Sequence, residues 1–257
     1  MKRLFVVLAF VASVFSANAW TKEVNGASHV LARKYMTKET LAEYKRISAL
    51  AKQLPSEQVR WVFDKESRVW LDGSLRAVAT CEKDIVVLIE KAVDVLRNRA
   101  QHSDLAVFKA LQTVQRLMPE LHNISTIAIE GIEDSQKGFS FTWTAGKEGS
   151  KTRGKQGTLT WRSLWTRNFC FMHSGWSSEY YAYDLDVRFK DQRERMQQGS
   201  VRDWAHEMGV TAKPMYDWAK PDMILRNEPR LNLEELHLSM VARAGYRLAV
   251  LLNEALK

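Results

Sequence analysis

Cysteine is scarce in this 257-residue chain, which holds only Cys81 and Cys170. Two cysteines are too few for a zinc site built from thiolates. In an oxidising compartment we expect the two to form a disulfide, and the closed loop would stabilise the fold by roughly 4–5 kcal/mol. Two buried free thiols are the alternative, because the sequence carries no geometry that decides between them.

Nucleotide-binding and hydrolase motifs are also absent. The chain has no P-loop, no G-x-G-x-x-G and no G-x-S-x-G, and its histidines include no H-x-x-x-H pair. Cys170 and His173 have C-x-x-H spacing, but a partner C-x-x-C is missing. We therefore interpret this pair as incidental and expect no new catalytic chemistry.

Long apolar runs are confined to the N-terminus. Two basic residues precede an apolar stretch at residues 4–15, which is too short to span a bilayer comfortably, and residues 17–19 (ANA) form a small-x-small cleavage site. This pattern predicts a signal peptide over residues 1–19 and an exported chain that begins at Trp20. An uncleaved anchor is the alternative, and the pattern is common to periplasmic and secreted proteins.

Positive charge is in excess, with a formal net charge of +8, which favours anionic partners such as nucleic acid, nucleotides or lipid headgroups. In the centre of the chain, basic residues alternate with Trp143, Trp161 and Trp165. Single-strand binding uses cations along the phosphates and rings stacked on bases, at about 1–3 kcal/mol per base. A solvated loop above core tryptophans is the alternative. The basic residues of this predicted anion-binding region are Lys147, Lys151, Arg153, Lys155, Arg162 and Arg167.

Apolar residues recur every three or four positions through most of the chain, and this periodicity predicts helices. Thr37 and Ser103 are suited to cap two of them, and Pro55 to end the first. Between residues 130 and 161 Gly, Ser and Lys predominate, and the alternating run FSFTW (139–143) predicts a hairpin. We expect one mainly α-helical domain over residues 20–257, a single-domain bundle with a basic loop or small β-hairpin insertion. The predicted helices cover residues 40–54, 57–71, 82–99, 104–118, 180–198, 200–208 and 232–257.

The C-terminal part of the chain resembles a known family. VARAGYRLAVLLNEAL (241–256) is similar to that family's closing helix, and RDWAHEM (202–208) followed by MYDW (215–218) resembles its Trp-x-x-Glu-Ser and Val-Tyr segment, with Met208 in place of the serine. The family is that of the S1/P1 nucleases, secreted zinc-dependent single-strand nucleases of the phospholipase C/P1 nuclease superfamily. The resemblance covers essentially the whole mature chain and implies that superfamily's helical fold.

The zinc ligands implied by this resemblance are mostly replaced. The family's N-terminal tryptophan, whose amino group and carbonyl bind zinc, corresponds to Trp20, and its first aspartate to Asp64. The family's HxxGDxHQPLH reads RLMPELHNIST (116–126), its Asn-Leu-His-x-x-Trp-Asp reads TWRSLWT (160–166), and a histidine expected near residues 68–72 is missing. The residues at the other ligand positions are Asn25, Arg116, Glu120, Thr126, Arg162 and Thr166.

Such a ligand set predicts a protein without zinc. Arginine has no lone pair to donate to a metal, so Trp20, Asp64 and Glu120 are vestigial metal positions, and we expect Trp20 to pack against the helices instead. His122 lies two residues past Glu120, and the α-helical geometry predicts that it points away from these positions.

The lost metals would leave the carboxylates of Asp64 and Glu120 without a counter-charge, which is a costly arrangement in a buried site. We expect Arg116 and Arg162 to supply that charge in an ion-pair network with Asp64 and Glu120. The alternative is four ordinary surface charges around a pocket closed by apolar residues.

These features predict an exported pseudonuclease, catalytically inactive, that binds an anionic ligand such as nucleic acid, or a protein partner, and needs no cofactor. The alternative is an active phosphodiesterase or endonuclease on single-stranded nucleic acid or nucleotides, with zinc held by Asp64 and Glu120. A third class is a structural or interaction protein with a filled cleft.

N-terminal sequencing of protein from an exporting host tests the predicted processing. We expect the mature chain to begin at Trp20. Ala19→Arg removes the small residue that signal peptidase requires and should abolish cleavage, whereas Ser16→Ala should leave it intact. A mature chain that begins elsewhere would contradict the predicted cleavage site.

Overall fold

The computed structural model of the protein describes residues 20–61, 64, 66–78, 82–132, 140–145, 155–171, 173, 175–220, 222–225 and 227–257. Of residues 140–145, 155–159, 168, 171, 225 and 227–231 it describes the backbone alone. The predicted signal peptide and Cys81 lie outside the described residues. The protein is mainly α-helical, as predicted. In the described part of the chain no helix is long and apolar enough to cross a membrane.

The secondary structure elements follow in chain order. The α-helices are α1 (Lys22–Lys34), α2 (Lys38–Ala49), α3 (Ser56–Val59), α4 (Ile85–Arg97), α5 (Asp104–Leu121), α6 (Trp161–Ser163), α7 (Phe169–Phe171), α8 (Ser178–Phe189), α9 (Arg193–Gln197), α10 (Val201–Trp218) and α11 (Asn227–Ala255). The 3-10 helices are η1 (Leu50–Lys52), η2 (Arg99–Gln101), η3 (Ile124–Thr126) and η6 (Lys190–Gln192), and η5 (Leu164–Asn168) is a π-helix. The strands are β1 (Val69–Leu71), β2 (Ile127–Ile129), β3 (Ser140–Ala145), β4 (Lys155–Thr160) and β5 (Met223–Leu225).

Helix starts follow the capping residues of the sequence. The Thr37 hydroxyl accepts a hydrogen bond from the Thr40 N–H at 3.1 Å, and the Ser103 hydroxyl accepts one from the Ala106 N–H at 3.3 Å. Each bond satisfies an N–H group that has no partner within its helix. The two predicted N-caps are therefore confirmed, and the first predicted helix ends before Pro55.

The predicted helix over residues 57–71 is wrong. It stops after α3, and residues 69–71 form β1, which pairs in parallel with β2. Asp84 explains the change, because its carboxylate caps α4 through the Val86 N–H at 2.7 Å and also accepts from the Trp70 N–H at 3.1 Å. The Arg68 carbonyl accepts from the Ile85 N–H at 2.9 Å. A neighbouring helix start thus holds this segment extended.

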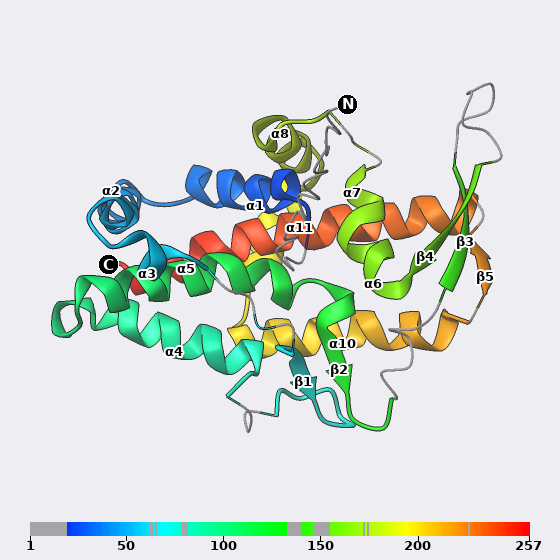
Figure 1. The fold of residues 1–257 in the computed structure, drawn as a ribbon, viewed down its shortest axis with the longest axis horizontal. Helices are drawn as coiled ribbons and strands as arrows, with labels where there is room; N and C mark the ends of the chain where they lie inside the picture. The colour runs from blue at the N-terminus through cyan, green and yellow to red at the C-terminus, as the bar shows by residue number, and fades with distance from the viewer. Residues whose placement is uncertain are drawn as a thin grey trace, which may run out of the picture.

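The glycine-rich middle of the chain contains the predicted hairpin. β3 pairs antiparallel with β4, and β3 also pairs in parallel with β5, which gives the order β4-β3-β5. In Figure 1 this small sheet lies at the end of the molecule opposite α2 and the C-terminus. The segment 146–154 that connects the two hairpin strands lies outside the described residues.

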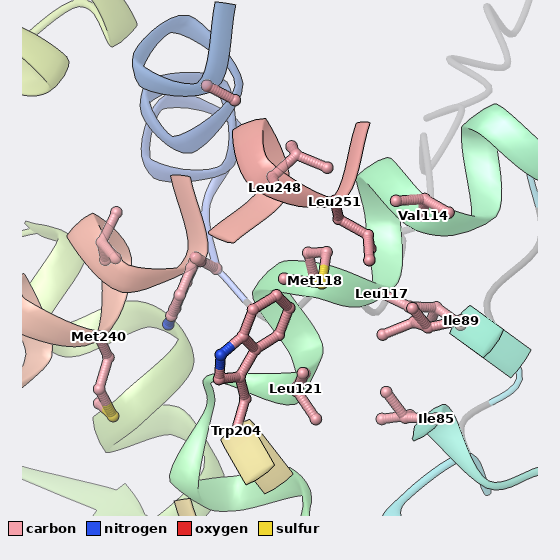
Figure 2. Packing of buried hydrophobic residues seen from close by; sticks show 14 of the residues in the cluster. Ile85, Ile89, Val114, Leu117, Met118, Leu121, Trp204, Met240, Leu248 and Leu251 are labelled. Carbon is pink, nitrogen blue, oxygen red and sulfur yellow. The ribbon is translucent and has the colours of Figure 1, made fainter. Parts of the chain in front are cut away.

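Helix α11 is the centre of the bundle. It runs lengthwise through the molecule between α1 on one side and α10 on the other (Figure 1). Figure 2 shows the core where side chains of α4, α5, α10 and α11 meet. Ile89, Leu117, Trp204 and Leu248 in this core are at most 2 % exposed, and each fully buried side chain of this size stabilises the fold by about 1.5–3 kcal/mol.

A buried guanidinium joins four helices inside this core. Arg247 of α11 is 1 % exposed, and its Nε donates to the Met196 carbonyl of α9 at 2.7 Å. Its Nη1 donates to Nε2 of His122 at 2.9 Å, and its Nη2 donates to the Glu207 carboxylate of α10. Burial lowers the pKa of Arg247 to about 10, while Glu207 raises it. Arg247 thus stays charged at neutral pH with each guanidinium nitrogen paired.

His122 must be neutral in this arrangement. Its Nδ1 lies 2.8 Å from the Met118 carbonyl, which can only accept, so Nδ1 carries the proton and Nε2 accepts from Arg247. Burial and the charge of Arg247 hold the pKa of His122 well below its usual range. His237 is also fully buried, and burial lowers its pKa to about 3.

Helices α1 and α11 approach closely at a glycine. A Cβ atom on Gly245 would lie 2.9 Å from the Ser28 carbonyl oxygen and 3.0 Å from the Leu31 Cβ, both on α1. Backbone atoms cannot move aside as a flexible side chain could. This contact therefore sets the distance between the two helices.

Gly245→Ala tests that contact. We expect the free energy of unfolding to fall by about 1–3 kcal/mol, because the clash outweighs the gain in helix propensity of roughly 1 kcal/mol. Chemical denaturation measures the change. Gly73→Ala is the control, since nothing lies within 4 Å of its added Cβ. Equal stability of the two variants would contradict the close packing.

Buried neutral His122 and His237 predict acid sensitivity, and His29, whose pKa burial lowers to about 4, acts in the same direction. The unfolded chain protonates each of them near pH 6.5, and the folded chain does so only at much lower pH, so their contribution to stability is present above about pH 6.5 and is lost below it. The free energy of unfolding should fall by about 1.4 kcal/mol per pH unit for each histidine as the pH drops below about 6.5. Urea titrations across this range measure the slope. His237→Gln should reduce the slope, while exposed His102→Gln should not.

Candidate anion-binding site

One irregular helical segment carries the centre of the site. It runs through α6, the π-helix η5 and α7, and begins where the Thr160 hydroxyl accepts from the Ser163 N–H at 3.2 Å. Trp161, Trp165 and Phe169 recur every four residues and are buried, with ring centroids 5.6 Å and 5.2 Å apart in turn. A π-turn within a helix is frequent at functional sites. The buried rings anchor the segment and leave Arg162 on another side of it.

Arg162 carries the least satisfied charge of the segment. Its Nη2 is buried and has no hydrogen-bond partner among the described residues. Burial lowers the pKa of Arg162; the Glu120 carboxylate acts against this and the Arg68 guanidinium adds to it. Arg162, Glu120 and Arg68 therefore lie close enough for their charges to interact.

Each neighbour of Arg162 is held by its own element. Glu120 is 2 % exposed near the end of α5, and the Thr126 hydroxyl donates to its backbone carbonyl at 2.5 Å. Arg68 is 7 % exposed and its Nη1 donates to the Ser67 carbonyl at 2.8 Å. The charges of Glu120 and Arg68 both act on Arg162, and two guanidinium groups with one carboxylate give this group of residues a net positive formal charge.

Asp64 and Arg116, the other members of the predicted network, lie apart from this centre. Asp64 is half-exposed, and Lys83 Nζ lies 3.2 Å from its carboxylate. The Glu66 N–H and Lys83 lower the pKa of Asp64, and Arg68 adds to the effect. Arg116 is exposed on α5, where its charge helps to lower the pKa of His29. The structure thus brings Arg162 and Glu120 of the predicted network into electrostatic reach of each other, while Asp64 pairs with Lys83 and Arg116 lies on the surface of α5.

Trp20 and Asn25 form a contact at the start of α1. Trp20 is 2 % exposed, and the Asn25 side-chain amide donates to its carbonyl at 2.7 Å. The Trp20 ring also meets the His237 ring edge-on, with centroids 5.7 Å apart. Asn25 thus engages the Trp20 carbonyl, which the resemblance implies as a vestigial metal position, in a hydrogen bond within the fold. Trp20 packs against the helices.

Thr126 and Thr166 are also turned toward the backbone. The Thr166 hydroxyl donates to the Arg162 carbonyl at 2.8 Å, one helical turn earlier. Both threonine hydroxyls therefore donate to backbone carbonyls close by in the chain. His122, which was predicted to point away, contacts Arg247.

The predicted basic region is described only in part. Lys147, Lys151 and Arg153 lie outside the described residues, as do the side chains of Lys155 and Trp143. Arg167 is exposed. Trp161 is 2 % and Trp165 is 0 % exposed, so neither ring is available to stack on a base. For these two tryptophans the core interpretation holds, because their spacing of four directs both rings inward.

The predicted disulfide is not found in the described part of the chain. Cys170 is a buried free thiol, while Cys81 lies outside the described residues. The sulfur of Cys170 faces the core, where it donates to the Thr166 carbonyl at 3.4 Å. His173, interpreted as incidental, places Nε2 3.0 Å from the Glu234 carboxylate.

Arg68 is the site residue that the sequence analysis missed. It belongs to the stretch that was predicted as helix, and its backbone contact with the start of α4 holds it in an extended segment from which its charge acts on Arg162. Among the described residues no group of three or more His, Cys, Asp and Glu side chains is arranged to hold a metal ion. No protein-family model matches the chain, and no curated protein matches it.

Proposed function

We propose that the protein is an exported, catalytically inactive relative of the S1/P1 nucleases that binds an anionic ligand beside Arg162. The observation that carries the proposal is the buried Arg162 Nη2, which has no hydrogen-bond partner among the described residues. The ring nitrogen of Trp165, on the same helical segment, is likewise a buried donor without an acceptor among the described residues. Donors in excess of acceptors favour a ligand rich in oxygen atoms.

Electrostatics support the same conclusion. Leaving a guanidinium donor buried without an acceptor costs about 1–3 kcal/mol or more, and a bound anion would remove that cost. A guanidinium also presents parallel N–H groups that suit phosphate and carboxylate oxygens. The nearby Arg68 adds attraction, while Glu120 limits how much negative charge the site takes.

The proposed ligand is recognised through its charged group. Because Trp161 and Trp165 are buried, base stacking on them does not contribute. A phosphate of a single-stranded nucleic acid or of a nucleotide fits this requirement. Hydrolysis receives less support, since arginine cannot ligate a metal and Lys83 lies beside the exposed carboxylate of Asp64.

A binding assay with Arg162→Gln tests the proposal. The probe is a fluorescent single-stranded oligonucleotide with a terminal phosphate, and inorganic phosphate is the competitor. We expect Arg162→Gln to weaken binding about 10- to 100-fold, because a hydrogen bond to a charged group is worth about 1.5–3 kcal/mol. Exposed Arg116→Gln removes the same charge and should change binding less than about threefold.

Salt and metals separate the alternatives. Wild-type affinity should fall as the salt concentration rises, because phosphate binding releases counterions. Equal loss in both variants would mean that only net charge matters and would contradict a site at Arg162. Absence of binding in the wild type would favour the structural protein, and zinc-dependent cleavage of the oligonucleotide would establish the phosphodiesterase instead.

A further inference from the structure

Cys170 and His237 form a buried pair that the proposed anion site does not use. Cys170 lies in α7 and is 5 % exposed, while His237 lies in α11 and is 0 % exposed. The Cys170 Sγ and His237 Nε2 atoms are 3.9 Å apart. Residues from two distant segments thus place a thiol and an imidazole nitrogen face to face in a dry environment.

The polar atoms around this pair are poorly satisfied. His237 Nδ1 is buried and has no hydrogen-bond partner among the described residues, and the same holds for the Tyr181 hydroxyl, whose residue is 1 % exposed. Burial raises the pKa of Tyr181, and the nearby Cys170 and Glu234 add to the effect. The hydrogen bond between Cys170 Sγ and His237 Nε2 directs these two atoms at each other, and a neutral imidazole nitrogen and a thiolate are both metal ligands.

Charge selects the type of metal. Burial raises the pKa of the Cys170 thiol to about 11, although hydrogen bonds with Thr21 lower it. A thiolate without a bound cation is therefore unfavourable there. A monovalent cation that replaces the thiol proton leaves the site neutral, whereas a divalent ion would leave one uncompensated positive charge in the core. Of the metals that thiolate ligands select, copper(I) is the monovalent one, and imidazole also suits copper.

We propose that Cys170 Sγ and His237 Nε2 bind one copper(I) ion between them. The thiol loses its proton to solvent, a sulfur–copper and a nitrogen–copper bond form, and copper stays in the +1 state throughout. Metal–thiolate and metal–imidazole bonds are about 2.3 and about 2.0 Å long for a first-row metal. An ion near the line between the two ligands therefore holds them roughly 4 Å apart, close to the separation seen.

Anaerobic titration with copper(I) against a chromophoric copper(I) chelator tests the proposal on the full mature chain. We expect one equivalent to bind. Cys170→Ser should weaken this binding at least about 100-fold, since the hydroxyl is a poor ligand for a soft ion. Cys81→Ser removes the other thiol and should leave the binding unchanged.

X-ray absorption of copper-loaded Cys81→Ser keeps the proposal testable if Cys170→Ser fails to fold. We expect one sulfur and one nitrogen ligand in the copper shell. Binding lost with Cys81→Ser, binding retained by folded Cys170→Ser, or a shell without sulfur would overturn the proposal. Zinc(II) bound as tightly as copper(I) would overturn the charge argument.

Discussion

The arrangement of the helices depends on the buried guanidinium of Arg247. It joins α11 to α9 through Met196, to α10 through Glu207 and to the end of α5 through His122. Removing one partner of such a network leaves a charge or a donor unpaired in the core, at a cost of about 3–5 kcal/mol. The requirement that His122 stay neutral couples this junction to pH.

The two buried arginines show how a structural charge differs from a binding charge. Arg247 has a protein acceptor for each of its nitrogens. Arg162 has a buried Nη2 with no partner among the described residues, and the charges of Glu120 and of a second arginine, Arg68, act on it. The first arrangement is complete without a ligand. The second lacks a hydrogen-bond acceptor for Arg162 Nη2. A bound anion would supply that acceptor, so we place the proposed function there.

Residues at the start of α1, in α7 and in α11 form a second neighbourhood. Asn25 bonds to the Trp20 carbonyl, and the Trp20 ring packs on His237, which in turn lies beside Cys170. Positions implied as zinc ligands by the resemblance are therefore used for packing and backbone bonds. The proposed copper site has a different ligand set and would arise from residues outside those positions.

Apolar periodicity and N-capping residues such as Thr37 and Ser103 predicted most of the helices, because periodicity and capping each act within a few residues of the chain. They also drew attention to Arg162 and Glu120. The sequence could not place β1, Arg68 or the pairing of Cys170 with His237. Periodicity alone favoured a helix at residues 57–71, and the contacts of Asp84 with β1 overrode it. Only the tertiary structure decided these features, because each depends on a partner distant in the chain.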